Sequence, residues 1–228
     1  MISLYNGKGY VKLVDHMGSD LSFCKAARAS FAKDAPEWNE KEERLLNFLV
    51  REGHLSVFRH AAVTFQIKAP LIVCRQHFKY QVASAHIDDQ NGWNEASRRY
   101  ITSDNEYYIP TADQWRYAPD DKKQGSGDLI DPRLGEHYTH LLTQHIEHGE
   151  KLYQHLLDIE VAPEIARLAL PAYALMVNYQ WTVSVANLLH FLQERVAHDA
   201  QLEIQQLALA VRDLTRPLYP STLKAFGL

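Results

Sequence analysis

Two polar clusters hold the side chains best suited to chemistry in this chain of 228 residues. The first spans residues 75–81 and 94–100, and it combines arginines, a lysine, a glutamate, a serine and several amides. Arginine can hold a phosphate through two parallel hydrogen bonds, and serine adds a short donor beside it. Glutamine and asparagine match the donor and acceptor edge of a uracil-like base. The cluster therefore predicts a pyrimidine nucleotide site, while a solvated helix with ion pairs such as Glu95–Arg99 is the alternative.

The second cluster is Ser184, Asn187, His190 and Arg195, on an otherwise apolar segment. Asn187 and His190 are three residues apart, so they share a face if the segment is helical. The alternative is a helix with a polar outer stripe. Two further histidines flank residues 55–59, where a predicted helix ends and a strand begins, and loops at such places often carry function.

Metal binding and cysteine nucleophiles are both disfavoured. His137, His140, His145 and His148 recur on one predicted helix, but the chain has no H-E-x-x-H motif and neither cysteine is near them. We expect a solvated helix flank and no metal. Cys24 and Cys74 lie in apolar surroundings, where a thiol has a raised pKa and is inert. The glycines show neither G-x-G-x-x-G nor Walker spacing, so a nucleotide or flavin would bind outside the usual dinucleotide fold.

Composition predicts a globular protein, because 46% of the residues are hydrophobic and 23% are charged. A formal net charge of −4 argues against a basic nucleic-acid-binding surface. The longest nearly uncharged apolar stretch, residues 168–177, is too short for a membrane span and contains Pro171. Residues 1–15 lack the apolar core of a signal peptide. We therefore expect a cytoplasmic protein with no membrane or nucleic-acid partner.

The elements that must position these clusters follow from hydrophobic periodicity. Alternation predicts strands at 9–15 and 61–69. A 3.6-residue period predicts helices at 20–31, with Asp20 as a candidate cap, and at 41–51, 71–82, 133–159, 163–179, 184–196 and 198–216. Residues 85–93 and 118–132 lack a period. Early strands, late helices and no clear linker predict a single α+β domain over residues 1–228.

Several segments in order along the chain resemble the flavin-dependent thymidylate synthases. They include Asn94-Glu95-Ala96-Ser97-Arg98-Arg99-Tyr100, and the full set covers residues 12–20, 26–31, 52–60, 69–76, 94–100, 181–183, 190–195 and 198–205. The resemblance implies an α+β fold with a small antiparallel sheet packed by helices. It also implies a homotetramer with active sites between subunits. Members of the family are methyltransferases that convert dUMP to dTMP with methylenetetrahydrofolate as carbon donor, FAD as hydride carrier and NADPH as reductant.

The resemblance also assigns roles by position. Arg195 falls on the arginine that contacts the pyrimidine and helps to ionise N3, so it is the catalytic candidate. The substrate-binding candidates are Gln76, His77, Phe78, Lys79, Glu95, Ala96, Ser97, Arg98, Arg99, Asn178 and Arg195. The flavin-binding candidates are Ser30, His54, Ser56, Lys79, Tyr80, Gln81, Glu95, Ser184 and His190.

The chain departs from the family pattern at several of these positions. Lys79-Tyr80-Gln81 stands where the family signature reads Arg-His-Arg, which keeps one positive charge but loses the planar guanidinium. Asn178 replaces an arginine for the substrate phosphate, and Ser184 and Ala186 replace an asparagine and an arginine on the flavin side. Two alternatives stay open: a pyrimidine deoxynucleotide hydroxymethylase on the same scaffold, or a non-catalytic nucleotide-binding protein.

Overall fold

The computed structural model describes residues 1–32, 34–80, 91–95, 105–120 and 125–228. A five-stranded antiparallel sheet runs through the middle of the molecule in the order β1-β2-β3-β5-β4. The strands are β1 (Ile2–Leu4), β2 (Gly9–Met17), β3 (Ala62–Pro70), β4 (Asn91–Glu95) and β5 (Met176–Ser184). The antiparallel sheet with packed helices confirms the predicted α+β class. The prediction of one domain over residues 1–228 stays a prediction.

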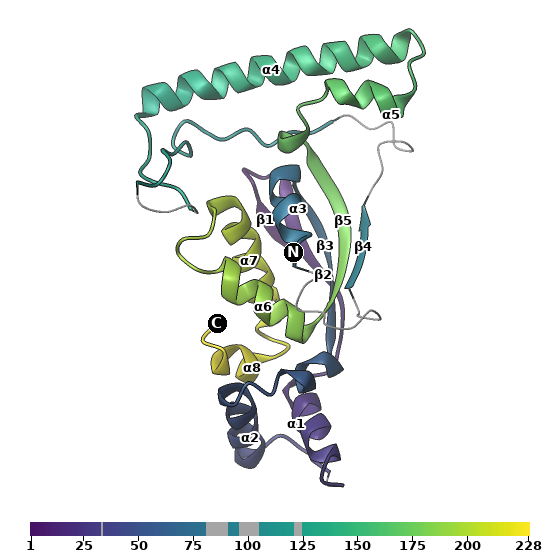
Figure 1. Ribbon diagram of the computed structural model, residues 1–228, viewed down its shortest axis with the longest axis vertical. Coiled ribbons are helices and arrows are strands. Elements are labelled where there is room, and N and C mark those ends of the chain that lie inside the picture. Colours follow the sequence, from purple (N-terminus) through teal and green to yellow (C-terminus); the bar gives the residue numbers. More distant parts are fainter. Residues whose placement is uncertain (33, 81–90, 96–104, 121–124) are drawn as a thin grey trace.

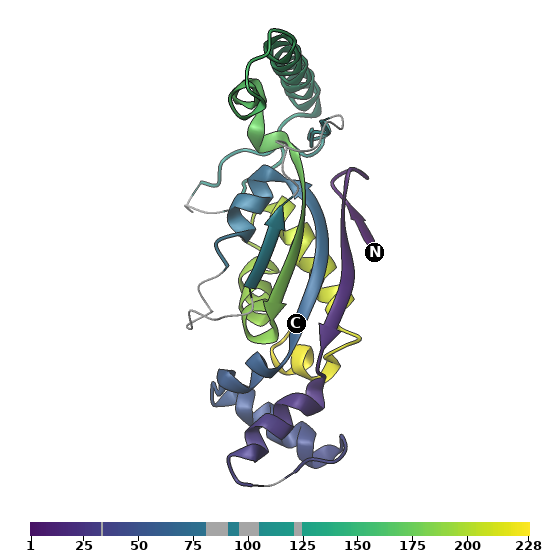
Figure 2. The same ribbon diagram turned by 90° about the vertical axis from the view of Figure 1, so that its right-hand side faces the viewer.

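Helices cover one face of the sheet and extend beyond both of its ends (Figures 1 and 2). The α-helices are α1 (Asp20–Ala29), α2 (Glu40–Arg51), α3 (Leu71–His77), α4 (Pro132–Asp158), α5 (Pro163–Ala166), α6 (Val185–Arg195), α7 (Leu202–Thr215) and α8 (Pro220–Ala225). Short 3₁₀ helices occupy Leu55–His60, Arg167–Ala169 and Ala172–Ala174. Figure 1 shows α3, α6 and α7 over the sheet, the long α4 beyond one end, and α1 and α2 beyond the other. Among the described helices, none has the combined length and apolar character needed to cross a bilayer.

The pairing of β3 with β5 forms the centre of the core. The two strands pair along all nine residues of each, and Phe65 stands opposite Trp181 with the rings stacked at 5.8 Å. Val63, Phe65 and Ile67 are fully buried, and the residues between them are only partly buried, which confirms the strand predicted at 61–69. Burial of each such large side chain is worth about 1.5–3 kcal/mol.

The prediction of a helix over 163–179 was wrong. The helix α5 ends at Ala166, two 3₁₀ turns follow, and β5 begins at Met176. Pro171 cannot continue a helix because it lacks a donor and its ring clashes with the preceding turn. Beyond it, Tyr179, Trp181 and Val183 are buried while the residues between them face outward, which is the period of a strand. Strands therefore occur late in the chain as well as early.

Two further helix predictions were wrong at their ends. The helix after β3 ends at His77 instead of Val82, and the last long helix begins at Leu202 instead of residue 198. As a result, Lys79 and Tyr80 lie beyond the end of α3, and Asp199 and Gln201 lie before the start of α7. These four residues line the cavities described below. The helices at 40–51, 132–158 and 185–195 begin and end within one residue of the prediction.

Asp20 caps a helix, but a different one from that predicted. Ser19 is the N-cap of α1, and Asp20 is its buried first residue. The Asp20 carboxylate accepts hydrogen bonds from the amides of Ser221 (2.9 Å) and Thr222 (3.0 Å) and from the Thr222 hydroxyl (2.6 Å). Asp20, near the start of the sequence, therefore supplies hydrogen-bond acceptors for the free backbone N–H groups in the first turn of α8.

Asp20→Asn should destabilise the fold. An amide replaces one carboxylate oxygen with a donor, so one of the three donors loses its acceptor in a buried site, at a cost of about 1–3 kcal/mol. Urea unfolding followed by circular dichroism measures this. The exposed Asp15→Asn is the control and should change stability by less than about 0.5 kcal/mol. Equal midpoints for the two variants would contradict the capping role.

Candidate functional site

The helices α3 and α6 bring the two polar clusters of the sequence together. Each helix begins directly after a core strand, α3 after Pro70 of β3 and α6 after Ser184 of β5. The Asn187 side-chain amide donates a buried hydrogen bond of 2.6 Å to the carbonyl oxygen of Tyr80, just beyond the end of α3. This bond fixes the polar turn after α3 against the first turn of α6.

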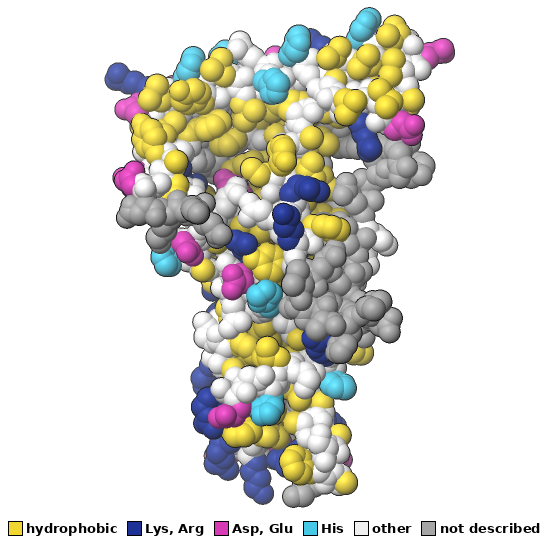
Figure 3. Space-filling model, viewed as in Figure 1, with side chains coloured by type: hydrophobic (Ala, Val, Ile, Leu, Met, Phe, Trp, Pro, Cys, Tyr) yellow, Lys and Arg dark blue, Asp and Glu magenta, His cyan; other side chains and the backbone are white. Residues whose placement is uncertain are grey.

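A cavity of about 540 Å³, which we call the α3–α6 cavity, lies between these helices. Its polar lining residues are Arg75, Gln76, Lys79, Tyr80, Tyr173, His190 and Arg195. Three of these side chains are cationic, and among the described lining residues none is acidic. Figure 3 shows Lys and Arg side chains gathered over α3 on this face of the molecule. The cavity therefore attracts an anion of the size of a nucleotide phosphate.

Arg195 is held in this cavity by an aromatic ring. Its guanidinium carbon lies 5.1 Å from the centroid of Tyr80, within the range of a cation–π contact. Burial raises the pKa of Tyr80, and Arg195 partly opposes that shift, so the phenol is neutral at physiological pH. The Arg195 Nε is buried and has no hydrogen-bond partner among the described residues. A ligand acceptor in the cavity would supply that partner.

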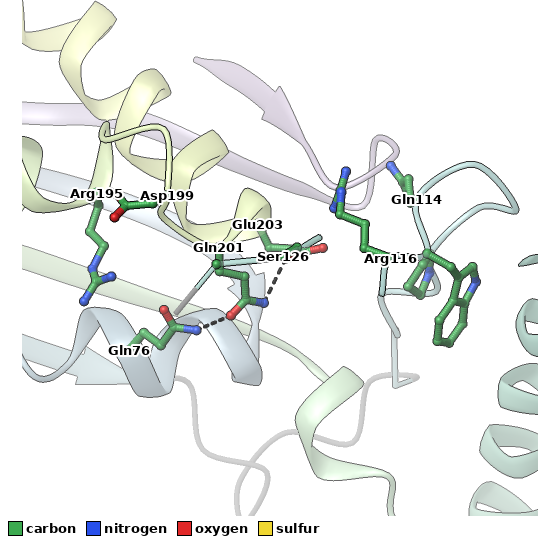
Figure 4. A pocket seen from close by; sticks show the side chains of 11 residues that line it. Gln76, Gln114, Arg116, Ser126, Arg195, Asp199, Gln201 and Glu203 are labelled. Atoms are coloured by element: carbon green, nitrogen blue, oxygen red, sulfur yellow. Dashed lines mark hydrogen bonds between the residues drawn. The ribbon is translucent and has the colours of Figure 1, made fainter. Parts of the chain in front are cut away.

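A second cavity of about 460 Å³, which we call the Gln201 cavity, shares Gln76 and Arg195 with the first. Its other polar residues include Arg116, Asp199, Gln201 and Glu203 (Figure 4). Three of these polar residues stand at every second position where the chain enters α7, namely Asp199, Gln201 and Glu203. The sequence analysis did not place these three side chains in one cavity, because a helix predicted from residue 198 gave no reason for them to converge.

A third cavity of about 500 Å³, which we call the α1–α2 cavity, gathers three predicted flavin-binding residues. Ser30, His54 and Ser56 line it together with Phe31 and Phe48. The rings of His54 and Phe48 are nearly parallel, with centroids 6.1 Å apart. None of the residues that line this cavity also lines the α3–α6 cavity, where Lys79, Tyr80 and His190 are found. A single chain thus divides six of the predicted flavin-binding residues between two cavities.

Three predicted site residues lie elsewhere. His77 is buried in the core, where it packs edge-on against Trp181 with ring centroids 4.2 Å apart. Ser184 is buried as the N-cap of α6, and its hydroxyl oxygen accepts a hydrogen bond from the backbone N–H of Asn187. Asn178 belongs to the outward-facing side of β5, beside the Tyr10 hydroxyl. The side chains of His77, Ser184 and Asn178 therefore do not face the α3–α6 cavity of their own chain.

Several predicted site residues cannot be placed in these cavities. Phe78 is described and exposed. Gln81, Ala96, Ser97, Arg98 and Arg99 lie outside the described residues. Glu95 is described only through its backbone, which pairs with Tyr179 at the end of β4.

The histidine-rich helix α4 and Cys24 lie apart from the α3–α6 cavity, and Cys74 is buried on α3 without lining that cavity. His137, His140, His145 and His148 are exposed on α4. Figure 3 shows histidine side chains on the surface along this helix. In the described part of the chain, no three His, Cys, Asp or Glu side chains are arranged to hold a metal ion. Burial raises the pKa of the Cys24 thiol to about 12, so it is not a thiolate nucleophile.

One protein family model matches nearly the whole chain. Residues 12–221 match the model described as thymidylate synthase complementing protein. The flavin-dependent thymidylate synthase of Thermosipho africanus is 37% identical over 219 residues, which are 96% of this chain and 91% of that protein. The protein of the same name from Thermotoga neapolitana is 36% identical with the same coverage. That of Wolbachia pipientis wMel is 32% identical over 96% of this chain and 73% of its own.

A solved structure matches the fold closely. The UMP/dUMP methylase PolB from Streptomyces cacaoi, bound with 5-Br dUMP, superposes with a TM-score of 0.82 and 29% identity. The match covers 96% of this chain and 94% of that one. The same enzyme bound with 5-Br UMP gives a TM-score of 0.79 and 28% identity, with coverage of 96% and 93%.

Burial of His77 should make the fold acid-sensitive. Desolvation lowers the pKa of His77 to about 3 in the folded chain, whereas the unfolded chain has the ordinary value of about 6.5. Between these values the unfolded chain binds one more proton, so stability falls as pH falls. From pH 7 to pH 5 this one group should cost about 2 kcal/mol.

His77→Gln should lose that part of the pH dependence, measured by urea unfolding at pH 7 and pH 5. The exposed His140→Gln is the control and should keep it. The same pH dependence in His77→Gln as in the unchanged protein would contradict the assignment.

Proposed function

Because the chain belongs to the thymidylate synthase complementing protein family, we propose that it is a methyltransferase that converts dUMP to dTMP. Methylenetetrahydrofolate would supply the carbon, FAD would carry the hydride and NADPH would be the reductant. The observation that carries this proposal is the cationic α3–α6 cavity, with Arg195 stacked on Tyr80.

The cavity suits an anionic pyrimidine nucleotide. Lys79 and Arg195 would supply positive charge toward the phosphate and the base, and Gln76 would supply an amide in the same cavity. Placed against N3 and O4 of uracil, Arg195 stabilises the negative charge that develops when C5 becomes nucleophilic. Donors aimed at developing charge in this way are worth about 10²–10³ in rate. This activation replaces the attack of a thiolate at C6, for which the two buried cysteines, Cys24 and Cys74, are unsuited.

The residues present also fit a flavin. The α1–α2 cavity combines the hydroxyls of Ser30 and Ser56 with the aromatic rings of Phe48 and His54. Apolar walls with a few polar groups suit a planar ring system. Lys79 and His190 would then meet the polar parts of the cofactor in the α3–α6 cavity. When bound, FAD supplies the hydride that completes the methyl group.

We propose that two copies of the chain complete each site within a homotetramer. In one chain, six of the flavin-binding candidates are divided between two cavities with different linings. A flavin that contacts both sets can do so when the α1–α2 cavity of one subunit faces the α3–α6 cavity of another. Asn178, on the outward face of the sheet, would also reach a neighbour's nucleotide in this arrangement.

Transfer of a hydroxymethyl group, with water replacing the hydride, is the second candidate. Tyr80 stands where the family signature has a histidine, and it is buried beneath Arg195 as a neutral phenol that cannot become cationic. Its ring therefore brings no positive charge toward the flavin. The mass of the product distinguishes the two reactions, because the hydroxymethyl product is heavier than dTMP by one oxygen atom.

Purified protein supplied with FAD, dUMP, methylenetetrahydrofolate and NADPH should form dTMP, measured by mass spectrometry. Arg195→Ala should lower kcat by at least about 100-fold and leave the circular dichroism spectrum unchanged. The exposed Arg216→Ala is the matched control and should keep full turnover. A flavin absorption band that shifts when dUMP is added would show binding independently of turnover. No product from the unchanged protein, or full activity in Arg195→Ala, would overturn this proposal.

Mixed oligomers test the shared site. His54→Ala and Arg195→Ala should each be inactive alone, and co-expression of the two should restore turnover, because some sites then combine an intact His54 with an intact Arg195. Inactive mixtures that still form heterotetramers would show that one chain supplies both residues. The groove of about 340 Å³ that joins Leu55 and Arg59 to His190 would then be the route of the cofactor.

A further inference from the structure

A chain of hydrogen bonds ends at the amide of Gln76. The Gln76 Nε2 donates to the Oε1 of Gln201, and the Gln201 Nε2 donates to the Oε2 of Glu203 at 2.8 Å. The other carboxylate oxygen of Glu203 accepts from the Tyr108 hydroxyl at 3.3 Å. Figure 4 shows the two amides in line between Glu203 and Arg195.

The direction of this chain is set at Glu203. An ionised carboxylate only accepts hydrogen bonds, whereas an amide can present either its oxygen or its nitrogen by rotating through 180°. The Gln201 side chain must therefore turn its nitrogen toward Glu203 in order to donate to the carboxylate. Its oxygen then points toward Gln76. That oxygen in turn requires the nitrogen of Gln76. One carboxylate thus orients two amides in succession.

Packing around Glu203 holds its carboxylate in place. Glu203 lies in the first turn of α7, where the helix dipole favours a negative charge. The Tyr5 hydroxyl donates to the Glu203 carbonyl oxygen at 3.1 Å, and the rings of Tyr5 and Tyr108 meet edge to face at 5.8 Å. Burial and the nearby carboxylate raise the pKa of Tyr108, so its hydroxyl stays a donor.

We propose that Glu203 and Gln201 are positioning residues that turn the carbonyl oxygen of Gln76 toward the ligand. The oxygen of Gln76 lies on the side of Arg195 (Figure 4), and both residues line the two adjoining cavities. Gln76 thereby accepts from a donor on the nucleotide, either a ring N–H or a sugar hydroxyl. The phosphate carries only acceptors, so it would bind to the cationic side chains of the α3–α6 cavity instead. This inference rests on the proposed nucleotide-binding function.

The first test needs no ligand. In ¹⁵N-labelled protein, the side-chain amide resonances of Gln76 and Gln201 are assigned with Gln76→Ala and Gln201→Met. Glu203→Gln should shift both pairs of resonances. Glu150→Gln is the matched control, because Glu150 also accepts from a tyrosine hydroxyl, that of Tyr107, and should leave both pairs unchanged. Unshifted Gln76 resonances in Glu203→Gln would overturn the relay, whether or not the protein binds dUMP.

The second test measures dUMP binding by calorimetry. Glu203→Gln and Gln201→Met should each weaken binding about fivefold to tenfold, the worth of about one hydrogen bond. If both residues act only through Gln76, neither change should weaken binding further once Gln76→Ala is present. Additive losses would mean a general structural role and would overturn the proposal. Failure of the unchanged protein to bind dUMP would instead overturn the proposed function.

Two analogues identify the donor. The 2′,3′-dideoxy analogue of dUMP lacks the sugar hydroxyl, and the N3-methyl analogue lacks the ring N–H. The analogue that lacks the donor should bind equally well to the unchanged protein and to Gln76→Ala, whereas the other analogue should discriminate between them. Discrimination with both analogues would show that Gln76 meets neither donor, and would overturn its assignment as an acceptor.

Discussion

The pairing of β3 with β5 is the constraint on which the rest of the structure depends. Phe65 and Trp181 stack across the two strands, and nine residues of each strand are in register. A slip of one residue would turn every buried side chain to the opposite face, so the aromatic core fixes this register. Because α3 and α6 leave the two strands directly, the same register determines where Gln76 and Arg195 meet.

The contact between the end of α3 and the start of α6 stabilises the fold and also positions Arg195 in the cavity. Asn187 ties the backbone at Tyr80 to α6, and the ring of Tyr80 then supports Arg195. A guanidinium that is stacked in advance loses less conformational freedom when a ligand binds. Tyr80, which cannot carry a positive charge, therefore fixes the position of the positive charge of Arg195.

Most of the fold could be predicted from the sequence, because its hydrophobic periods are clear along β3, α2, α4 and α6. The strand β5 was missed because its apolar residues also fit a helical period, and only the alternation of Tyr179, Trp181 and Val183 distinguishes the two. The cavity residues Arg195, Gln76 and Lys79 stood out by type and spacing. His77 was misleading because its neighbours are polar, whereas its own side chain points into the core.

Gln201 and Glu203 show why a site cannot be derived completely from spacing. Neither residue belongs to a local motif, and their role depends on a hydrogen bond to Gln76 across 125 positions of the chain. Residues that touch a ligand can be predicted from their chemistry, because the ligand limits which types will serve. Residues that orient them are limited only by geometry, since any fixed acceptor in the place of Glu203 would direct the amides in the same way. The sheet register, the early end of α3 and the late start of α7 together supply that geometry.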